Sequence, residues 1–265
     1  MKVSVDDRSV FFSTGSGRAP VDAPAIVFLH GAGFDHTVWV MPSRFFARHG
    51  FAVFSVDLPG HGRSDGPALT SVVALADWVQ AFLDAVGVAR CTLVGHSMGS
   101  LIALMTAARH PERIGHIALL GTSEPMPVTS LLLDAAADND HAAIDMANAW
   151  SHSARGAMGR AENPGSHNLH HGERLLERAA DGVFHADLAA CNGFALPADA
   201  VLAQPALVIV GGADKMTPPK AGMAVVERLP QAQHCVLPNS GHSMLSECPN
   251  EVLDALASFI LPTMS

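Results

Sequence analysis

One serine of the chain lies in a setting that could make it a nucleophile. Ser97 is the centre of GHSMG at 95–99, between an apolar run (91–96) and a helix-like segment (98–110). A strand-to-helix turn this sharp holds the serine in a strained conformation and leaves room only for glycine two positions away on either side. The helix N-terminus would direct backbone N–H groups toward developing negative charge. The pattern predicts a serine nucleophile, and a serine that merely caps a helix is the alternative.

A serine nucleophile needs a base, and His242 is the candidate. It lies in NSGHS at 239–243, directly after the last strand-like run, 233–238. The chain has 15 histidines, so residue type alone does not select one. Position does, because His242 alone follows the final strand and its loop would lie at the same sheet edge as Ser97.

The base in turn needs an acid that fixes its tautomer. Asp214 ends the sequence GGAD at 211–214, after the apolar run 206–212. Glu124, which follows the preceding apolar run 114–121, is the rival acid. We favour Asp214 because its loop neighbours that of His242 in chain order, although it could also be a plain helix cap.

A glycine-rich turn, HGAG at 30–33, ends another buried apolar run, 25–30. Backbone N–H groups of such a turn can stabilise an oxyanion together with the residue after the nucleophile. We therefore expect the N–H groups of Ala32 and Met98 to form an oxyanion hole. A glycine turn with no chemical role is the alternative.

The elements that must position these residues alternate along the chain. Two short strands, 3–5 and 10–14, are followed by six apolar runs at 25–30, 51–57, 91–96, 114–121, 206–212 and 233–238. Helix-like segments separate these runs, which favours an α/β fold with a mostly parallel, doubly wound sheet of about eight strands. Such sheets bind ligands at the carboxyl ends of their strands.

The alternation stops after residue 123. Residues 124–198 are rich in Ala, His, Asn and Met, carry no buried strand run, and contain helix-like pieces near 129–151 and 170–190. We predict a core domain formed by 1–123 and 199–265, with a helical lid, 124–198, inserted after the sixth strand.

A pocket for an acyl group should be lined by large apolar residues near the motifs and in the lid. The candidates are Phe34, Trp150, Phe194 and Met244. Each of them could instead belong to the core of the lid or of the sheet.

Three lid histidines, His167, His170 and His171, have a spacing that could bind a metal. The polar residues around them favour a solvated loop, so we predict no metal site.

The composition excludes several classes of partner. The formal net charge is −9 and the pI is about 5.9, which disfavours binding to nucleic acid or to anionic membranes. Four scattered cysteines, the lack of a signal-peptide pattern and the lack of a membrane-spanning run lead us to expect a cytoplasmic protein with free thiols. A neutral or apolar small molecule fits this composition best as a substrate.

Five motifs together resemble those of the α/β-hydrolase superfamily. They are HGAG at 30–33, DLPGHGRSD at 57–65, GHSMG at 95–99, GGADKMTPP at 211–219 and NSGHSMLSE at 239–247. These motifs are most similar to those of the branch that contains esterases, enol-lactonases, haloperoxidase-like enzymes and C–C-bond hydrolases. The resemblance covers 1–123 and 200–262 and implies the order Ser97, Asp214, His242. It also implies that 57–65 is a structural loop in which Asp57 bonds to nearby backbone.

The resemblance and the motifs predict hydrolysis of a small to medium carboxylic ester or lactone through an acyl-enzyme, with no cofactor. Cleavage of a C–C bond in a vinylogous diketone is one alternative, although such enzymes usually have a Trp soon after the catalytic His and this chain has SMLS at 243–246. A non-enzymatic small-molecule receptor on the same scaffold is another. Relatives that open epoxides or remove halides use Asp in place of Ser97, and the epoxide hydrolases also use lid tyrosines, which this chain lacks.

Overall fold

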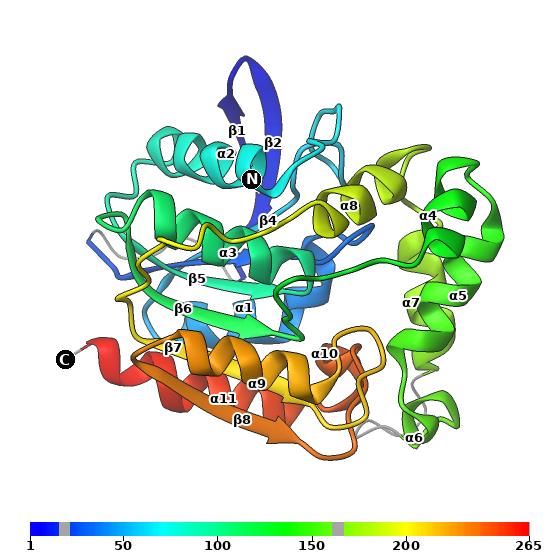
Figure 1. The fold of residues 1–265 in the computed structure, drawn as a ribbon. Coiled ribbons are helices and arrows are strands. Elements are labelled where there is room, and N and C mark those ends of the chain that lie inside the picture. Colours follow the sequence, from blue (N-terminus) through cyan, green and yellow to red (C-terminus); the bar gives the residue numbers. More distant parts are fainter. Residues whose placement is uncertain (16–21, 161–166, 265) are drawn as a thin grey trace.

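A computed structural model describes residues 1–15, 22–160 and 167–264 (Figure 1). Its centre is one eight-stranded sheet with the strand order β1-β2-β4-β3-β5-β6-β7-β8. The strands are β1 (Lys2–Val5), β2 (Arg8–Ser13), β3 (Ala25–Leu29), β4 (Ala52–Val56), β5 (Cys91–His96), β6 (Ile114–Leu120), β7 (Ala206–Gly211) and β8 (Ala232–Leu237). β1 and β2 are antiparallel to their neighbours, and β3 to β8 run parallel. The predicted fold class and strand number are confirmed.

The described part of the chain has eleven α-helices and two short 3₁₀ helices besides the strands. Those of the core are η1 (His36–Trp39), α1 (Val40–Arg48), α2 (Val72–Ala85), α3 (Met98–Arg109), α9 (Pro219–Arg228), α10 (Met244–Glu247), α11 (Pro249–Ile260) and η2 (Leu261–Met264). Those between β6 and β7 are α4 (Ser130–Ala137), α5 (His141–Ser151), α6 (Ala154–Ala157), α7 (Asn168–Leu176) and α8 (Val183–Asn192). None of the described helices is both long and apolar enough to cross a bilayer.

The sheet is covered on both faces, which explains why its central strands are continuous apolar runs. Every residue of β3, β5 and β7 is buried. Apolar residues of α2, α3 and α9 pack on one face, and those of α1 and α11 pack on the other. On the second face Trp39 and Phe46 are fully buried against Phe28 of β3. Burial of a side chain of this size contributes about 1.5–3 kcal/mol.

The helices between β6 and β7 form one group (α4 to α8, the inserted helices). In Figure 1 the helices α4 to α7 lie beyond the arrowheads of β6 and β8, at the carboxyl edge of the sheet. The helix-like pieces expected near 129–151 and 170–190 are each divided into two helices. Asn139 and Gly182 have φ values of 52° and 78°, which end one helix before the next begins.

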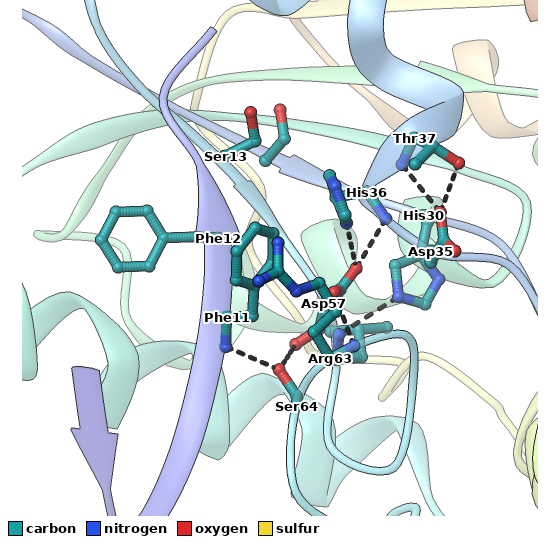
Figure 2. A network of polar contacts seen from close by, with 12 residues as sticks. Phe11, Phe12, Ser13, His30, Asp35, His36, Thr37, Asp57, Arg63 and Ser64 are labelled. Carbon is teal, nitrogen blue, oxygen red and sulfur yellow. Dashed lines mark hydrogen bonds and ion pairs between the residues drawn. The ribbon is translucent and has the colours of Figure 1, made fainter. Parts of the chain in front are cut away.

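The loop that follows β4 is tied to the turn that follows β3 (Figure 2). One carboxylate oxygen of Asp57 accepts hydrogen bonds from the backbone N–H and from Nδ1 of His36, both at 2.7 Å. The other oxygen accepts from the backbone N–H of Arg63 at 2.9 Å. Burial alone would raise the pKa of Asp57, but the hydrogen bonds and the charge of His36 outweigh burial and lower it. Asp57 is therefore ionised, and its hydrogen bonds join two loops at the carboxyl edge of the sheet.

Candidate active site

The backbone at Ser97 has the strained geometry that its sequence predicts. Its φ and ψ are 53° and −120°, between the end of β5 and the start of α3. A Cβ atom at Gly95 would overlap the Gly99 carbonyl, and one at Gly99 would overlap the Leu29 carbonyl. The Ser97 N–H donates to the Leu120 carbonyl at 2.9 Å. Neighbouring strands and two glycines thus hold the side chain of Ser97 at the sheet edge.

His242 and Asp214 meet beside this turn. Nδ1 of His242 lies 2.8 Å from Oδ2 of Asp214, and the Thr217 hydroxyl donates to the same oxygen at 2.7 Å. The other carboxylate oxygen, Oδ1, accepts from the backbone N–H groups of Met216 and Thr217, both at 2.8 Å. Each carboxylate oxygen thus has two hydrogen-bond partners, which fixes the carboxylate relative to the imidazole ring.

The charge state of Asp214 follows from these contacts. Burial alone would raise its pKa, but the charge and hydrogen bond of His242 and the bonds from Thr217 outweigh burial and lower it. Asp214 is therefore ionised throughout the neutral range. The rival acid, Glu124, lies elsewhere: its carboxylate accepts from the Leu196 N–H at 3.0 Å and pairs with Arg228. Asp214, and not Glu124, bonds to His242.

Sequence reasoning missed the part that His96 plays in joining the two motifs. Its Nε2 donates to the His242 carbonyl at 2.9 Å, so the residue before Ser97 holds the loop that carries His242. Burial, followed by the nearby charge of His242, lowers the pKa of His96 to about 3. His96 is therefore neutral near pH 7, and its contact with the carbonyl places the single ring proton on Nε2.

The inserted helices support the His242 loop from the other side. The backbone N–H of Ser243 donates to the carbonyl of Ser151, the last residue of α5, at 2.9 Å. The buried carboxylate of Glu247 accepts from the N–H of Ser153 at 3.2 Å and also from its hydroxyl. These contacts join segments about 90 residues apart in the chain, so no local sequence pattern could have shown them.

Two backbone N–H groups beside Ser97 have no acceptor among the described residues, namely those of Ala32 and Met98. A Cβ atom at Gly31 would lie 3.1 Å from the Cβ of Ser97, which shows how closely the turn after β3 approaches the serine. The next N–H, that of Gly33, is already used because it donates to Asp187 at 2.8 Å. The two free donors are therefore the ones that the sequence predicts.

A cavity of about 130 Å³ separates these groups from the inserted helices. Its floor includes Ser97 and His242, and its walls include Phe34 and Trp150 as expected. The Ser97 hydroxyl makes no hydrogen bond to His242 within the described chain, and such bonds are often long until a substrate is bound. An apolar cavity above a serine and a histidine can hold an acyl group while excluding water.

The expectation that Phe194 and Met244 line the pocket is wrong, because neither residue borders this cavity. Phe194 follows the end of α8 and is buried in the sheet core, in one cluster with Cys191 and Leu196. Met244 begins α10 and is fully buried in the core on the opposite face. The segment between β6 and β7 supplies other apolar residues to the cavity: Met126 and Val128 from the stretch before α4, and Leu132, Leu176, Phe184 and Leu188 from the inserted helices. The i,i+4 spacing of Phe184 and Leu188 was a signal that could have found part of this wall.

Two groups of side chains in the described chain have the spacing of metal ligands. Asp35, His36 and Asp57 form the first, but Asp35 accepts from Thr37 and Asp57 accepts from three N–H groups. Protein donors therefore already satisfy these carboxylates, as Figure 2 shows.

The second group of possible ligands, His141, Glu173 and Glu177, lies on the outer surface of α5 and α7 and its turn. The rings of His167 and His170 lie with their centroids 4.5 Å apart and their planes tilted by 32°, and His170 pairs with Glu173. None of these side chains borders the cavity.

Comparison with known proteins agrees with this geometry. A family model described as the alpha/beta hydrolase fold matches residues 24–249. The chain belongs to the α/β-hydrolase family. Among the relatives of this hydrolase, the putative carbamate hydrolase RutD of Agrobacterium fabrum is 26% identical over 93% of this chain and 96% of its own length. The 2-hydroxy-6-oxononadienedioate/2-hydroxy-6-oxononatrienedioate hydrolase of Burkholderia vietnamiensis is 35% identical, but the match covers only 48% of this chain and 46% of that protein.

Among solved structures, the α/β-hydrolase is similar to Est816, described as an N-acyl homoserine lactone degrading enzyme. The TM-score is 0.84 at 25% identity, and the match covers 98% of this chain and all of the other. The two relatives are named as hydrolases of different substrates, and Est816 is described as a lactone-degrading enzyme. They therefore show that the chain is a hydrolase of this superfamily. The type of bond that it cleaves has to be inferred from its own site.

Proposed function

We propose that the protein hydrolyses a small to medium carboxylic ester or lactone, with Ser97 as the nucleophile. The observation that carries the proposal is the 2.8 Å contact between His242 and the ionised Asp214, beside a strained serine on the floor of an apolar cavity. This combination meets the needs of acyl transfer, which are an activated hydroxyl, a base with a fixed tautomer and a dry acyl site.

In the proposed reaction, Oγ of Ser97 attacks the carbonyl carbon while its proton moves to Nε2 of His242. Asp214 bonds to Nδ1, so it stabilises the imidazolium and directs Nε2 toward the serine. The N–H groups of Ala32 and Met98 bind the oxyanion. His242 then protonates the departing alkoxide, and the acyl group stays on Ser97.

Water completes the cycle. His242 takes a proton from a water molecule, the resulting hydroxide attacks the acyl carbon, and the Ser97 oxygen leaves with that proton. The products are a carboxylic acid and an alcohol, or one hydroxy acid if the substrate is a lactone. The balance requires only water.

We also propose that segment 124–198 acts as a lid domain that sets the acyl range. Most of the apolar wall of the cavity comes from this segment, including Trp150 and Phe184. A volume of about 130 Å³ favours a compact acyl group over a long chain. A small-molecule substrate is therefore the partner that we expect.

The test combines a fluorophosphonate probe with panels of esters and lactones of increasing chain length. We expect the probe to label Ser97, as read by mass spectrometry of the peptide, and Ser97→Ala to abolish turnover without a change in melting temperature. Ser100 is the internal control, because it lies in the same turn but its hydroxyl already donates to the Ser97 carbonyl at 2.6 Å. Labelling of Ser100 in place of Ser97, or activity in the Ser97→Ala protein, would contradict the proposal. A vinylogous diketone in the panel distinguishes a C–C-bond hydrolase from an esterase.

A further inference from the structure

A buried carboxylate of the inserted helices reaches into the core beside the candidate oxyanion turn. Asp187 of α8 is 1% exposed, and its Oδ2 accepts two hydrogen bonds. One comes from the backbone N–H of Gly33 at 2.8 Å, and the other comes from Nε2 of His61 at 2.7 Å. A single oxygen thus joins α8, the turn after β3 and the loop after β4.

The surroundings of His61 show that this contact is an ion pair. Nδ1 of the ring lies 3.0 Å from the Pro59 carbonyl, and Nε2 lies 2.7 Å from Asp187. Both neighbours are acceptors, so both ring nitrogens must donate, and only the imidazolium can do that. Burial alone would lower the pKa of His61, but the charge and hydrogen bond of Asp187, with the Pro59 bond, outweigh burial and raise it.

The other titratable groups around the pair are His30, Asp57 and Cys191. Burial, followed by the charge of His61, lowers the pKa of His30 to about 4, and its Nε2 accepts from the Leu58 N–H at 3.1 Å. Burial raises the pKa of the Cys191 thiol. His30 and Cys191 are therefore neutral near pH 7, while Asp57 is ionised and favours the charged form of His61.

The Gly33 N–H is one peptide away from the Ala32 N–H that has no acceptor among the described residues. Gly33 has a φ of 69°, and a Cβ atom there would come within 2.9 Å of Leu176 and Phe184 of the inserted helices. The turn is therefore held by Asp187 from one side and covered by apolar groups of α7 and α8 from another. Its backbone orientation depends on where the inserted helices lie.

We propose that Asp187 and His61 are positioning residues that hold the 31–34 turn in the orientation in which the Ala32 N–H can bind an oxyanion. The inference rests on the proposed function, because it assigns a role within that reaction. Through this contact, the formation of the oxyanion hole depends on the inserted helices being packed in their native position. Neither side chain touches the substrate.

A buried ion pair is seldom a source of stability, because the cost of removing two charges from water can exceed their attraction. In proteins, replacing such a pair by apolar residues of similar volume is often neutral or stabilising. A helix anchor alone therefore does not explain why a charged pair occupies this position. A charged acceptor does fix the direction of an N–H, which an apolar contact cannot do.

The experiment compares Asp187→Leu, Asp187→Asn and a matched control, Arg178→Gln. Arg178 forms another ion pair between the inserted region and the core, with Asp35 at 3.2 Å. Asp35 directly follows the 31–34 turn, but its pair with Arg178 involves none of the N–H groups of that turn. Loss or misplacement of one oxyanion donor typically costs about a hundredfold in kcat. We expect Asp187→Leu to lower kcat on that scale with KM little changed. Asp187→Asn keeps an oxygen acceptor and should fall between Leu and wild type, while Arg178→Gln should behave as wild type.

The pH profile separates positioning from simple packing. Because the pKa of His61 is raised, the pair is intact below the usual value of 6.5 and is lost as the pH rises through the higher folded value. We expect kcat of the wild type to decline on this alkaline side. His61→Gln can still donate to Asp187 but cannot titrate, so its kcat should be lower near neutral pH and free of that decline.

Hydrogen exchange gives a readout that does not need turnover. We expect the amides of 31–34 to exchange faster in Asp187→Leu than in wild type, and not in Arg178→Gln. Unchanged exchange, unchanged kcat, or a fall in kcat that only mirrors the loss of folded protein would overturn the positioning role. If Ser97→Ala stays active while exchange rises as expected, the proposed reaction fails but the hold of Asp187 on the turn stands.

Discussion

Replacing Asp214 with asparagine should reverse the hydrogen-bond polarity at His242. Oδ1 of Asp214 accepts two backbone N–H bonds from Met216 and Thr217, so the amide oxygen of an asparagine would take that place. The amide NH₂ would then lie where Oδ2 now faces Nδ1 of His242 at 2.8 Å. A donor at that point requires Nδ1 to accept, which moves the ring proton to Nε2. The ring could then no longer take the proton of Ser97.

The size of the effect follows from this loss of the useful tautomer. In serine hydrolases the corresponding change lowers kcat by about 10³- to 10⁴-fold, which is about 4–5.5 kcal/mol at 1.36 kcal/mol per tenfold. Because the cavity wall is untouched, KM should change little. Steady-state hydrolysis of a short p-nitrophenyl ester from pH 5 to about 9 measures both constants. Thermal melting in the same buffers shows whether the variant is folded.

The matched control is Glu124→Gln, which removes the rival carboxylate and its pairing with Arg228. This variant should retain kcat near the wild-type value and lose only some stability. The assignment of Asp214 as the acid fails if Asp214→Asn is folded and keeps kcat within about tenfold of wild type. It also fails if Glu124→Gln is the inactive variant.

Three further outcomes follow from the packing and the charges. Trp150→Ala should change the ratio of kcat/KM between short and longer acyl chains by about ten- to two-hundredfold. Phe194→Ala should instead lower the free energy of unfolding by about 3–5 kcal/mol and reduce the activity toward every substrate alike. Below about pH 4, melting curves should show wild type losing stability faster than Asp57→Asn, because a carboxyl group with a lowered pKa contributes its full stabilisation above the ordinary value of 3.8 and loses it as the pH falls through the lower folded value. Cys91, whose pKa is raised to about 12 by burial, and Cys191 should react with a thiol reagent only after unfolding, as read by absorbance.

Local patterns predicted the sheet and the place of Ser97 because both depend on short segments. A fully buried parallel strand is an apolar run, and the turn at 95–99 needs glycine at both ends whatever surrounds it. The approach of Asp214 to His242 could be predicted because both loops follow neighbouring parallel strands, β7 and β8, whose carboxyl ends lie at one edge.

The wall of the cavity could not be predicted in the same way. Phe194 and Met244 are large and near the motifs in sequence, but which way they face depends on how a short helix enters and leaves the core. The contact of Asp187 with His61 spans 126 residues and has no local signature at all. Helix periodicity predicts which residues share a face, but not the element against which that face packs.

The pairing of β6 with β7 has a consequence for how such enzymes diversify. The chain leaves β6 after Leu120 and re-enters at Ala206, and these strands are direct neighbours in the sheet. Because the strands are parallel and Leu120 pairs with Ile209, the two ends of the excursion lie one strand across and three residues along from each other, about 11 Å apart, and backbone hydrogen bonds fix that separation. Since the entropy of closing a loop grows only with the logarithm of its length, doubling such an excursion costs only about 0.6 kcal/mol. Insertions and deletions at this point can therefore accumulate in a lineage and remodel substrate range, while the strands that carry Ser97, Asp214 and His242 are inherited unchanged.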